Sequence, residues 1–330
     1  MLRYRLARKP SYVILHVTTR CNLACRTCFV SPAVHEPELE FFQSISRDIG
    51  SLMWLDIGGG EPFLRSDLPE ICSLFKAEVL SIPTNGWDTD SIVSGINHIR
   101  NVFSGRLILS VSLDGPETRH DSIRAPNSWK RAVRTIKLIR TIPDVSVKIN
   151  TVICNENLDA IPAFLPWVHT LGVDAHSLIL LRGEPRDDTL TTPSPDAIRA
   201  LLPAIHAQLN TYSYDTNWLA RRVLSAYHRL LWDVTIRTLE SKTQVVPCLG
   251  GANHVVIWAD KSAGSCEMLE PVGSLVEHRL SELMKSGEWA AQRRFIREKK
   301  CWCTHNCALL ASLPFHMTWL ARIMTKMPIR

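Results

Sequence analysis

The chain has no apolar segment long enough to cross a membrane as a helix. Its apolar runs stay below the roughly 18 residues that a bilayer requires. The basic N-terminus, MLRYRLARKP, is not followed by a small-residue cleavage site, and the sequence from Tyr12 is that of a strand rather than of a signal-peptide core. The sequence therefore predicts a cytoplasmic protein.

Charge of one sign is not concentrated in any part of the chain. The 330 residues carry a formal net charge of +6, and no stretch interleaves aromatic side chains with Lys and Arg. A surface that binds nucleic acid is expected to show such a cluster, so no nucleic-acid partner is predicted. With 45% apolar and 21% charged residues, the composition is typical of a globular protein.

The ten cysteines do not have the distribution of a disulfide framework. Large cytosolic chains keep their thiols reduced. Cys72 and Cys154 are isolated in apolar stretches, which indicates buried hydrophobic residues. The others form one group near the N-terminus and one near the C-terminus, both with the close spacing of metal ligands.

Residues 12–181 alternate short apolar strands with longer amphipathic segments. The strand candidates begin at Tyr12, Met53, Glu78, Arg106, Asp144 and Gly172. Apolar strands separated by helices indicate a parallel sheet that helices cover. The fold class predicted is α/β, a partial (β/α)6 barrel of the TIM type with functional groups at the carboxyl ends of the strands. A flat doubly wound sheet is the alternative, with its site at the same strand ends.

We expect the chain to divide into four parts. Residues 1–185 form the barrel, and 186–245 form a helical linker or lid that opens with a polar, proline-rich stretch. Residues 246–310 form a small α+β domain with the later cysteines, and 311–330 form a basic amphipathic tail.

The tail has apolar residues at helical spacing and only basic charges. Such a helix is suited to an anionic membrane surface or to a partner protein. A terminal helix docked on the barrel is the alternative. The apolar stripe comprises Leu313, Met317, Leu320, Ile323, Met324 and Met327.

The first cysteine group directly follows the first predicted strand. Cys21, Cys25 and Cys28 lie in the segment TTRCNLACRTCF. Three thiolates can ligate three irons of a [4Fe–4S] cubane and leave the fourth iron open to another ligand. A zinc site that takes its fourth ligand from elsewhere is the alternative.

A second motif, Gly59-Gly60-Glu61-Pro62, follows the second predicted strand. Glycine lets the backbone approach a ligand closely, and Glu61 can accept hydrogen bonds from an ammonium group. Alone, this segment is also typical of a turn. In register with the C-x3-C-x2-C motif, it resembles the radical S-adenosylmethionine (SAM) superfamily.

The resemblance implies that the open iron chelates the amino and carboxylate groups of SAM, and that the Gly-Gly-Glu-Pro strand end binds the amino group. Thr84-Asn85-Gly86, at the third strand end, fits the same pattern. Further SAM contacts are implied at later strand ends and in the HDSIRAP segment, although each residue could instead form a turn or a helix cap. These are Phe29, Ser112, Asp114, Arg124 and Asn150. One departure is Thr27, where many members have an aromatic residue that packs on adenine.

The second cysteine group comprises Cys248, Cys266, Cys301, Cys303 and Cys307. It resembles the C-terminal SPASM extension of radical SAM enzymes, or the shorter twitch form. The resemblance implies one auxiliary [4Fe–4S] cluster held by four of the five cysteines, including Cys248 and Cys266. His305 could replace a thiolate or simply occupy a turn. A structural zinc site with four cysteines is the alternative.

The function implied is that of a radical SAM enzyme of the oxidoreductase or lyase type. A low-potential donor such as flavodoxin or ferredoxin supplies an electron, and SAM is cleaved to methionine and a 5′-deoxyadenosyl radical. This radical abstracts hydrogen from a substrate carbon, and the auxiliary cluster aids oxidation or ligates the substrate.

The substrate is less clearly indicated than the reaction. Eleven residues precede Tyr12, too few for the leader-binding module of many peptide-modifying relatives. This favours a small molecule such as a sugar, an aminocyclitol or a lipid-linked intermediate, with a ribosomal peptide as the alternative. Two alternatives belong to other functional classes: a non-catalytic zinc or iron–sulfur scaffold, and a membrane-associated electron carrier. An electron carrier would leave the Gly-Gly-Glu-Pro motif unexplained.

Overall fold

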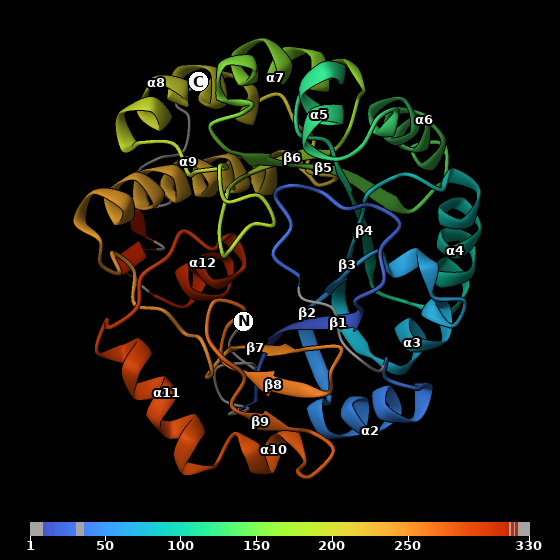
Figure 1. The fold of residues 1–330 in the computed structure, drawn as a ribbon, viewed down its shortest axis with the longest axis vertical. Helices are drawn as coiled ribbons and strands as arrows, with labels where there is room; N and C mark the ends of the chain where they lie inside the picture. The colour runs from blue at the N-terminus through green and yellow to red at the C-terminus, as the bar shows by residue number, and fades with distance from the viewer. Residues whose placement is uncertain (1–8, 31–35, 317, 320, 323–330) are drawn as a thin grey trace.

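The computed structural model describes residues 9–30, 36–316, 318–319 and 321–322 (Figure 1). Its strands form one nine-stranded sheet in the order β6-β5-β4-β3-β2-β1-β7-β8-β9. All neighbouring pairs from β1 to β6 are parallel, which confirms the predicted six-stranded partial barrel. These strands are β1 (Tyr12–Thr18), β2 (Ser51–Gly59), β3 (Lys76–Thr84), β4 (Arg106–Ser112), β5 (Val145–Ile153) and β6 (Ala175–Leu180).

Three short strands of the region predicted to form the small α+β domain continue this sheet. Strand β7 (His254–Ile257) pairs in parallel with β1 on the side opposite β2. Strands β8 (Ser262–Gly264) and β9 (Gly273–Ser274) then follow in antiparallel order. The region of the later cysteines is therefore joined to the barrel through backbone hydrogen bonds.

Helices surround the outer face of the sheet in an arc (Figure 1). The arc comprises α2 (Leu39–Ile49), α3 (Leu68–Leu74), α4 (Thr89–Val102), α5 (Glu117–Ile123), α6 (Ser128–Ile139) and α7 (Ile161–Thr170). The later helices are α8 (Pro195–Leu209), α9 (Trp218–Ser241), α10 (Leu280–Leu283), α11 (Gly287–Arg297) and α12 (Asn306–Ser312). Short 3-10 turns lie at η1 (Pro62–Leu64), η2 (Leu158–Ala160) and η3 (Leu313–Phe315).

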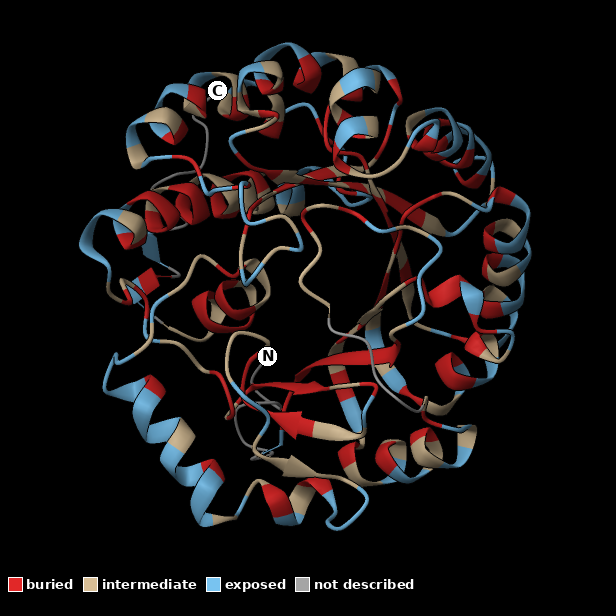
Figure 2. Ribbon diagram, viewed as in Figure 1, coloured by how far each residue is buried: buried red, intermediate tan, exposed pale blue. Residues whose placement is uncertain are grey.

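Alternate residues of each strand face opposite sides of the sheet. One set, which includes Leu15, Leu55, Leu80, Leu109 and Ile149, is buried in the main hydrophobic core. The other set faces the inside of the barrel, here called the lumen, and is partly polar: it includes His16, Asp56, Ser81, Ser110 and Lys148. Figure 2 shows that buried residues concentrate on the strands, whereas exposed residues lie on the outer faces of the helices.

Helix α12 packs inside the ring of helices (Figure 1). Its Ala311 is buried with Tyr12 and Ile14 of β1 and with Val256 of β7. The helix therefore closes part of the lumen and brings the end of the chain against the first strand.

The described part of the C-terminal tail is docked on the protein. Leu313 is fully buried, and Trp319 packs with Tyr227 and Leu230 of α9. These contacts agree with the docked-helix alternative. The other stripe residues, Met317, Leu320, Ile323, Met324 and Met327, lie outside the described residues. Within the described part of the chain, no helix is long and apolar enough to cross a membrane.

Candidate functional site

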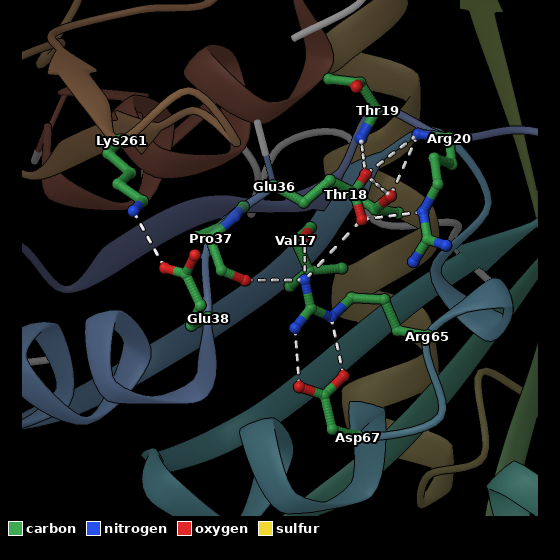
Figure 3. A network of polar contacts seen from close by, with 10 residues as sticks. All are labelled: Val17, Thr18, Thr19, Arg20, Glu36, Pro37, Glu38, Arg65, Asp67 and Lys261. Atoms are coloured by element: carbon green, nitrogen blue, oxygen red, sulfur yellow. Dashed lines mark hydrogen bonds and ion pairs between the residues drawn. The ribbon is translucent and has the colours of Figure 1, made fainter. Parts of the chain in front are cut away.

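A polar network fixes where the cysteine loop leaves β1 (Figure 3). Arg65 donates to the backbone carbonyls of Val17 and Pro37, both at 3.0 Å, and forms a two-pronged ion pair with Asp67. The Glu36 carboxylate accepts hydrogen bonds from the Thr18 hydroxyl and from the backbone N–H groups of Thr19 and Arg20. The residues immediately before Cys21 are thereby held in place.

The three cysteines of the first group lie in this loop, next to donors from other strand ends. Asn85 Nδ2, which follows β3, lies 3.7 Å from Cys21 Sγ. Arg124 Nη1, at the end of α5, lies 3.7 Å from Cys25 Sγ. Burial raises the pKa of both thiols, and the Arg124 guanidinium opposes this for Cys25. These donors stabilise the thiolate forms that an iron cluster requires.

The far side of the cysteine loop is clamped by backbone hydrogen bonds. Arg26 N donates to Ile123 O at 2.8 Å, and Arg186 N donates to Cys28 O at 2.8 Å. The Arg26 side chain forms an ion pair with Asp187 at 2.7 Å. The loop is therefore held between the end of α5 and the segment after β6.

The Gly-Gly-Glu-Pro segment packs directly on the start of the cysteine loop. Gly59 has a φ of +101°, and a Cβ there would lie 2.0 Å from Thr18 O. A Cβ on Gly60 would lie 2.1 Å from Arg20 O. Both glycines are thus needed for one motif to pack against the other, in addition to any approach to a ligand.

Glu61 is buried and held by donors from its own turn and from the end of β3. Its carboxylate accepts from Thr84 Oγ1 at 2.9 Å, Asn85 N at 2.7 Å and Phe63 N at 3.3 Å. Burial outweighs these donors and raises the pKa of the carboxyl to about 7. A cation beside Glu61 would therefore find a carboxyl group that ionises readily near neutral pH.

The predicted residues on β4 and β5 are brought together at one level of the barrel. Ser112 and Asn150 are paired neighbours, and Asn150 is in turn paired with Ser177 of β6. Asn150 Oδ1 is buried and has no hydrogen-bond partner in the described structure. It is therefore an acceptor oriented for a group that the protein itself does not supply.

Asp114 is oriented toward Arg124. Its carboxylate accepts from Arg124 Nε at 2.6 Å and from Val152 N at 2.8 Å, and it is fully buried. Both oxygens are thus already engaged by the protein, and the carboxylate holds the guanidinium next to Cys25.

Phe29 contacts a segment that reaches the second cysteine group. The Arg182 guanidinium lies 5.3 Å from the centre of the Phe29 ring. The same guanidinium lies 3.4 Å from Glu267, the residue after Cys266. These contacts connect the two cysteine groups across the lumen mouth.

Four cysteines of the second group line one cavity. They are Cys248, Cys266, Cys301 and Cys303. The pKa of the Cys248 thiol is raised to about 11, chiefly by burial and in smaller part by nearby Cys303 and Cys301. Gln244 Nε2 lies 3.5 Å from Cys301 Sγ. It also donates to the backbone carbonyls of Ile296, in the last turn of α11, and of Cys301, in the loop that follows.

Cys307 is oriented away from this cavity and into the lumen. Its thiol lies 3.7 Å from Asp56 Oδ2, which also accepts from Tyr12 Oη at 3.0 Å. His305 is fully buried, and its Nε2 lies 2.9 Å from Glu267. The structure therefore separates Cys307 from the other four cysteines and gives His305 a carboxylate partner.

The thiols of the two cysteine groups are not gathered around a single point. Among the described residues, no three Cys, His, Asp or Glu side chains are gathered closely enough to hold one ion. Four thiolates around zinc, with bonds of about 2.3 Å, would have to lie within about 3.8 Å of one another. A cubane holds its ligands at separate iron corners, so its thiolates lie farther apart than those around one zinc ion.

Two lumen residues were missed at the level of sequence. Asp56 and Lys148 each interrupt an apolar strand, within LDIGG and VSVKINT. A lone charge between two core-facing residues of a strand must face the opposite side of the sheet. This pattern could have identified both as lumen residues.

Curated relatives match different shares of the chain, and no family model matches it. A GTP 3′,8-cyclase of Vibrio atlanticus is 27% identical over 56% of this chain and 58% of its own. The mycofactocin maturase MftC of Mycolicibacterium smegmatis is 28% identical over 47% and 41%. An AdoMet-dependent heme synthase of Oleidesulfovibrio alaskensis is 24% identical over 88% and 78%. The chain thus spans about half the length of the first two relatives.

Solved structures share the fold at low identity. SuiB of Streptococcus suis, solved with S-adenosylmethionine, matches with a TM-score of 0.65 over 89% of this chain and 70% of its own, at 14% identity. The enzyme anSMEcpe, solved with AdoMet, matches with a TM-score of 0.60 over 96% of both chains, at 15% identity. These relatives and solved structures belong to the radical SAM superfamily, which includes SPASM-type members, and the chain is similar to them in sequence and fold.

Proposed function

We propose that the protein is a radical SAM enzyme that acts on a substrate bound in its lumen. The observation that carries the proposal is the convergence of the Cys21, Cys25 and Cys28 loop, the Gly-Gly-Glu-Pro turn and Arg124 at one end of the parallel strands. When bound, the cluster and SAM supply a 5′-deoxyadenosyl radical that can take hydrogen from an unactivated carbon. A low-potential donor such as flavodoxin or ferredoxin supplies the electron.

The residues around the cluster have separate roles in this proposal. The three thiolates ligate three irons, and Arg124, held by Asp114, limits the negative charge at Cys25. Glu61 accepts hydrogen bonds from the SAM ammonium. The unpartnered Asn150 Oδ1, with Ser112 beside it, accepts hydrogen bonds from SAM hydroxyls.

SAM binding is expected to weaken by about fivefold between pH 7 and pH 6, because Glu61 with a pKa of about 7 is half ionised at the upper pH and mostly neutral at the lower. The sign follows from the charge: only the carboxylate attracts the ammonium. This range avoids deprotonation of the amino group of SAM, which has a reference pKa of about 7.7–8.0. Equilibrium dialysis of the cluster-loaded protein measures the effect.

The control for this experiment is Glu61→Gln, which keeps the shape of the side chain and removes its titration. This variant should bind SAM more weakly at pH 7 and with a nearly flat dependence on pH. An exposed substitution, Glu70→Gln on α3, should retain the slope of the unmodified protein. An equal slope in Glu61→Gln would contradict the role given to this carboxyl.

The auxiliary cluster is proposed to be held by Cys248, Cys266, Cys301 and Cys303. Four cysteine ligands occupy every iron corner of a cubane, so no iron remains open to the substrate. This favours electron transfer over substrate ligation as its role. The contacts of Arg182 with Phe29, which follows Cys28, and with Glu267, which follows Cys266, support a short path between the two cysteine groups.

For the substrate, we favour a small molecule such as a sugar, an aminocyclitol or a lipid-linked intermediate. Helix α12 packs on the inner face of β1 and β7, and polar side chains such as Asp56 also face the lumen, which suits a polar small molecule. A ribosomal peptide is the second candidate, since SuiB has also been solved with its precursor peptide SuiA.

The proposal is tested by anaerobic purification followed by iron and sulfide analysis and reduction with dithionite in the presence of SAM. We expect about eight irons per chain, as two cubanes require, and release of 5′-deoxyadenosine. Zinc in place of iron would support the scaffold alternative. Fully iron-loaded protein that leaves SAM intact would overturn the proposal.

A further inference from the structure

The lumen contains a lysine that none of the steps above uses. Lys148 lies in the middle of β5, between Val147 and Ile149, which are both buried in the outer core. Its side chain therefore faces the lumen. Within the described part of the chain, its ammonium group has no hydrogen bond and no ion pair. Lys148 is half-buried, and an ammonium group partly withdrawn from water is stabilised by an anion beside it.

Asp56 is the carboxylate that influences Lys148 electrostatically, although no ion pair joins the two side chains in the described structure. Its Oδ2 is engaged by Tyr12 Oη and the Cys307 thiol. Burial is the largest influence on the lysine and lowers its pKa, while Asp56 and Cys307 oppose this. The ammonium remains available to a ligand.

A second donor without a partner lies beside Lys148. Ser110 of β4 is the paired neighbour of Lys148, and it faces the lumen because Leu109 and Val111 face the core. It is 1% exposed, and its hydroxyl has no hydrogen-bond partner among the described residues. Two adjacent donors, one of them charged, form a site for an oxyanion.

The position of this pair suits a substrate rather than SAM. Lys148 precedes Asn150 by two residues on the same strand, so its backbone lies about 6.6 Å deeper in the barrel than the level of Ser112 and Asn150. A ligand held at Lys148 would extend from there toward the lumen mouth, where the first cysteine group lies.

We propose that Lys148 and Ser110 bind an anionic group of the substrate, a phosphate or a carboxylate, at the floor of the lumen. This rests on the proposed function only in treating the lumen as the substrate site. The anchored group orients the substrate so that a carbon farther along it faces the radical.

The test is reductive methylation of the anaerobic, cluster-loaded protein with formaldehyde and a borane reductant, read at each lysine by mass spectrometry. Inorganic phosphate should slow methylation of Lys148 by about tenfold when it exceeds its dissociation constant about tenfold. Exposed Lys137 on α6 should react at the same rate throughout, at constant ionic strength balanced with chloride. Acetate is the parallel probe for a carboxylate.

Protection by phosphate alone assigns a phosphate-bearing substrate, and equal protection by acetate assigns a carboxylate. Protection by neither anion, equal protection of Lys137, or a Lys148 that does not react without anion would overturn the proposal. Calorimetry provides a second measurement: Lys148→Met should remove the heat of phosphate binding and Ser110→Ala should weaken binding, whereas Lys137→Met should change neither.

The proposal and the enzyme assignment can fail separately. Phosphate protection is measured without SAM, and SAM cleavage is measured on the same preparation without phosphate. Intact cleavage with no protection would overturn only the anion site. Protection without cleavage would overturn only the enzyme assignment.

Discussion

Replacing Cys21, Cys25 and Cys28 together by alanine is expected to abolish release of 5′-deoxyadenosine and to leave about four irons per chain. The loss should be complete because the three thiolates are the only protein ligands proposed for this cluster: Asn85 and Arg124 contact its sulfurs as donors. Iron analysis and chromatography of the SAM products measure both effects.

The matched control for this experiment is Cys72→Ala. Cys72 is fully buried in the outer core among the helices and has no role in either cysteine group. This variant should retain about eight irons and the rate of SAM cleavage, with at most a modest loss of stability. Cleavage that persists in the triple variant would contradict the assignment of the first cluster.

Replacing Cys303 by alanine is expected to remove the auxiliary cluster, whereas replacing Cys307 is expected to retain it. Cys303 lines the same cavity as Cys248, Cys266 and Cys301, and Cys307 lies at Asp56 in the lumen. Cys303→Ala should therefore contain about four irons and Cys307→Ala about eight. Iron analysis and the paramagnetic resonance spectrum of the reduced protein distinguish the two variants.

The two substitutions control for each other, because each removes one buried thiol from the same short C-W-C-T-H-N-C segment. The reverse result, with four irons lost from Cys307→Ala and none from Cys303→Ala, would contradict the ligand set. Loss of the auxiliary cluster should leave the first cluster and its SAM binding in place, since the cysteine loop is held by β1, α5 and the segment after β6.

Much of the fold could be predicted because it depends on local pattern. Strands with apolar residues in the β1 to β6 segments, separated by amphipathic helices, specify a parallel sheet covered by helices. The same reasoning missed that β7 pairs with β1. That pairing joins residues about 240 positions apart and leaves no periodic signal in either segment.

The site could be predicted only in part, for a similar reason. Motif spacing identified the cysteines and Gly59 to Pro62, because those residues must lie close together in sequence to act together. It did not show that Asp114 is directed to Arg124, since this ion pair depends on how α5 returns over the end of β4. Nor did it show that Lys148 and Ser110 are neighbours, which the strand register determines.

The sequence by itself determined the chemistry of this protein: the three-cysteine loop and the glycine turn each use residues that are close in the chain, and the later cysteines are recognised by their number in residues 248–307. Only the tertiary structure decided which of the functional residues lie next to one another. It separated Cys307 from the other four cysteines and oriented it toward Asp56. It also brought unpaired donors from β4 and β5 to one place in the lumen. The physical reason is that the spacing of a motif is a property of a short segment, whereas the lumen is formed by strands that come together only when the sheet curves.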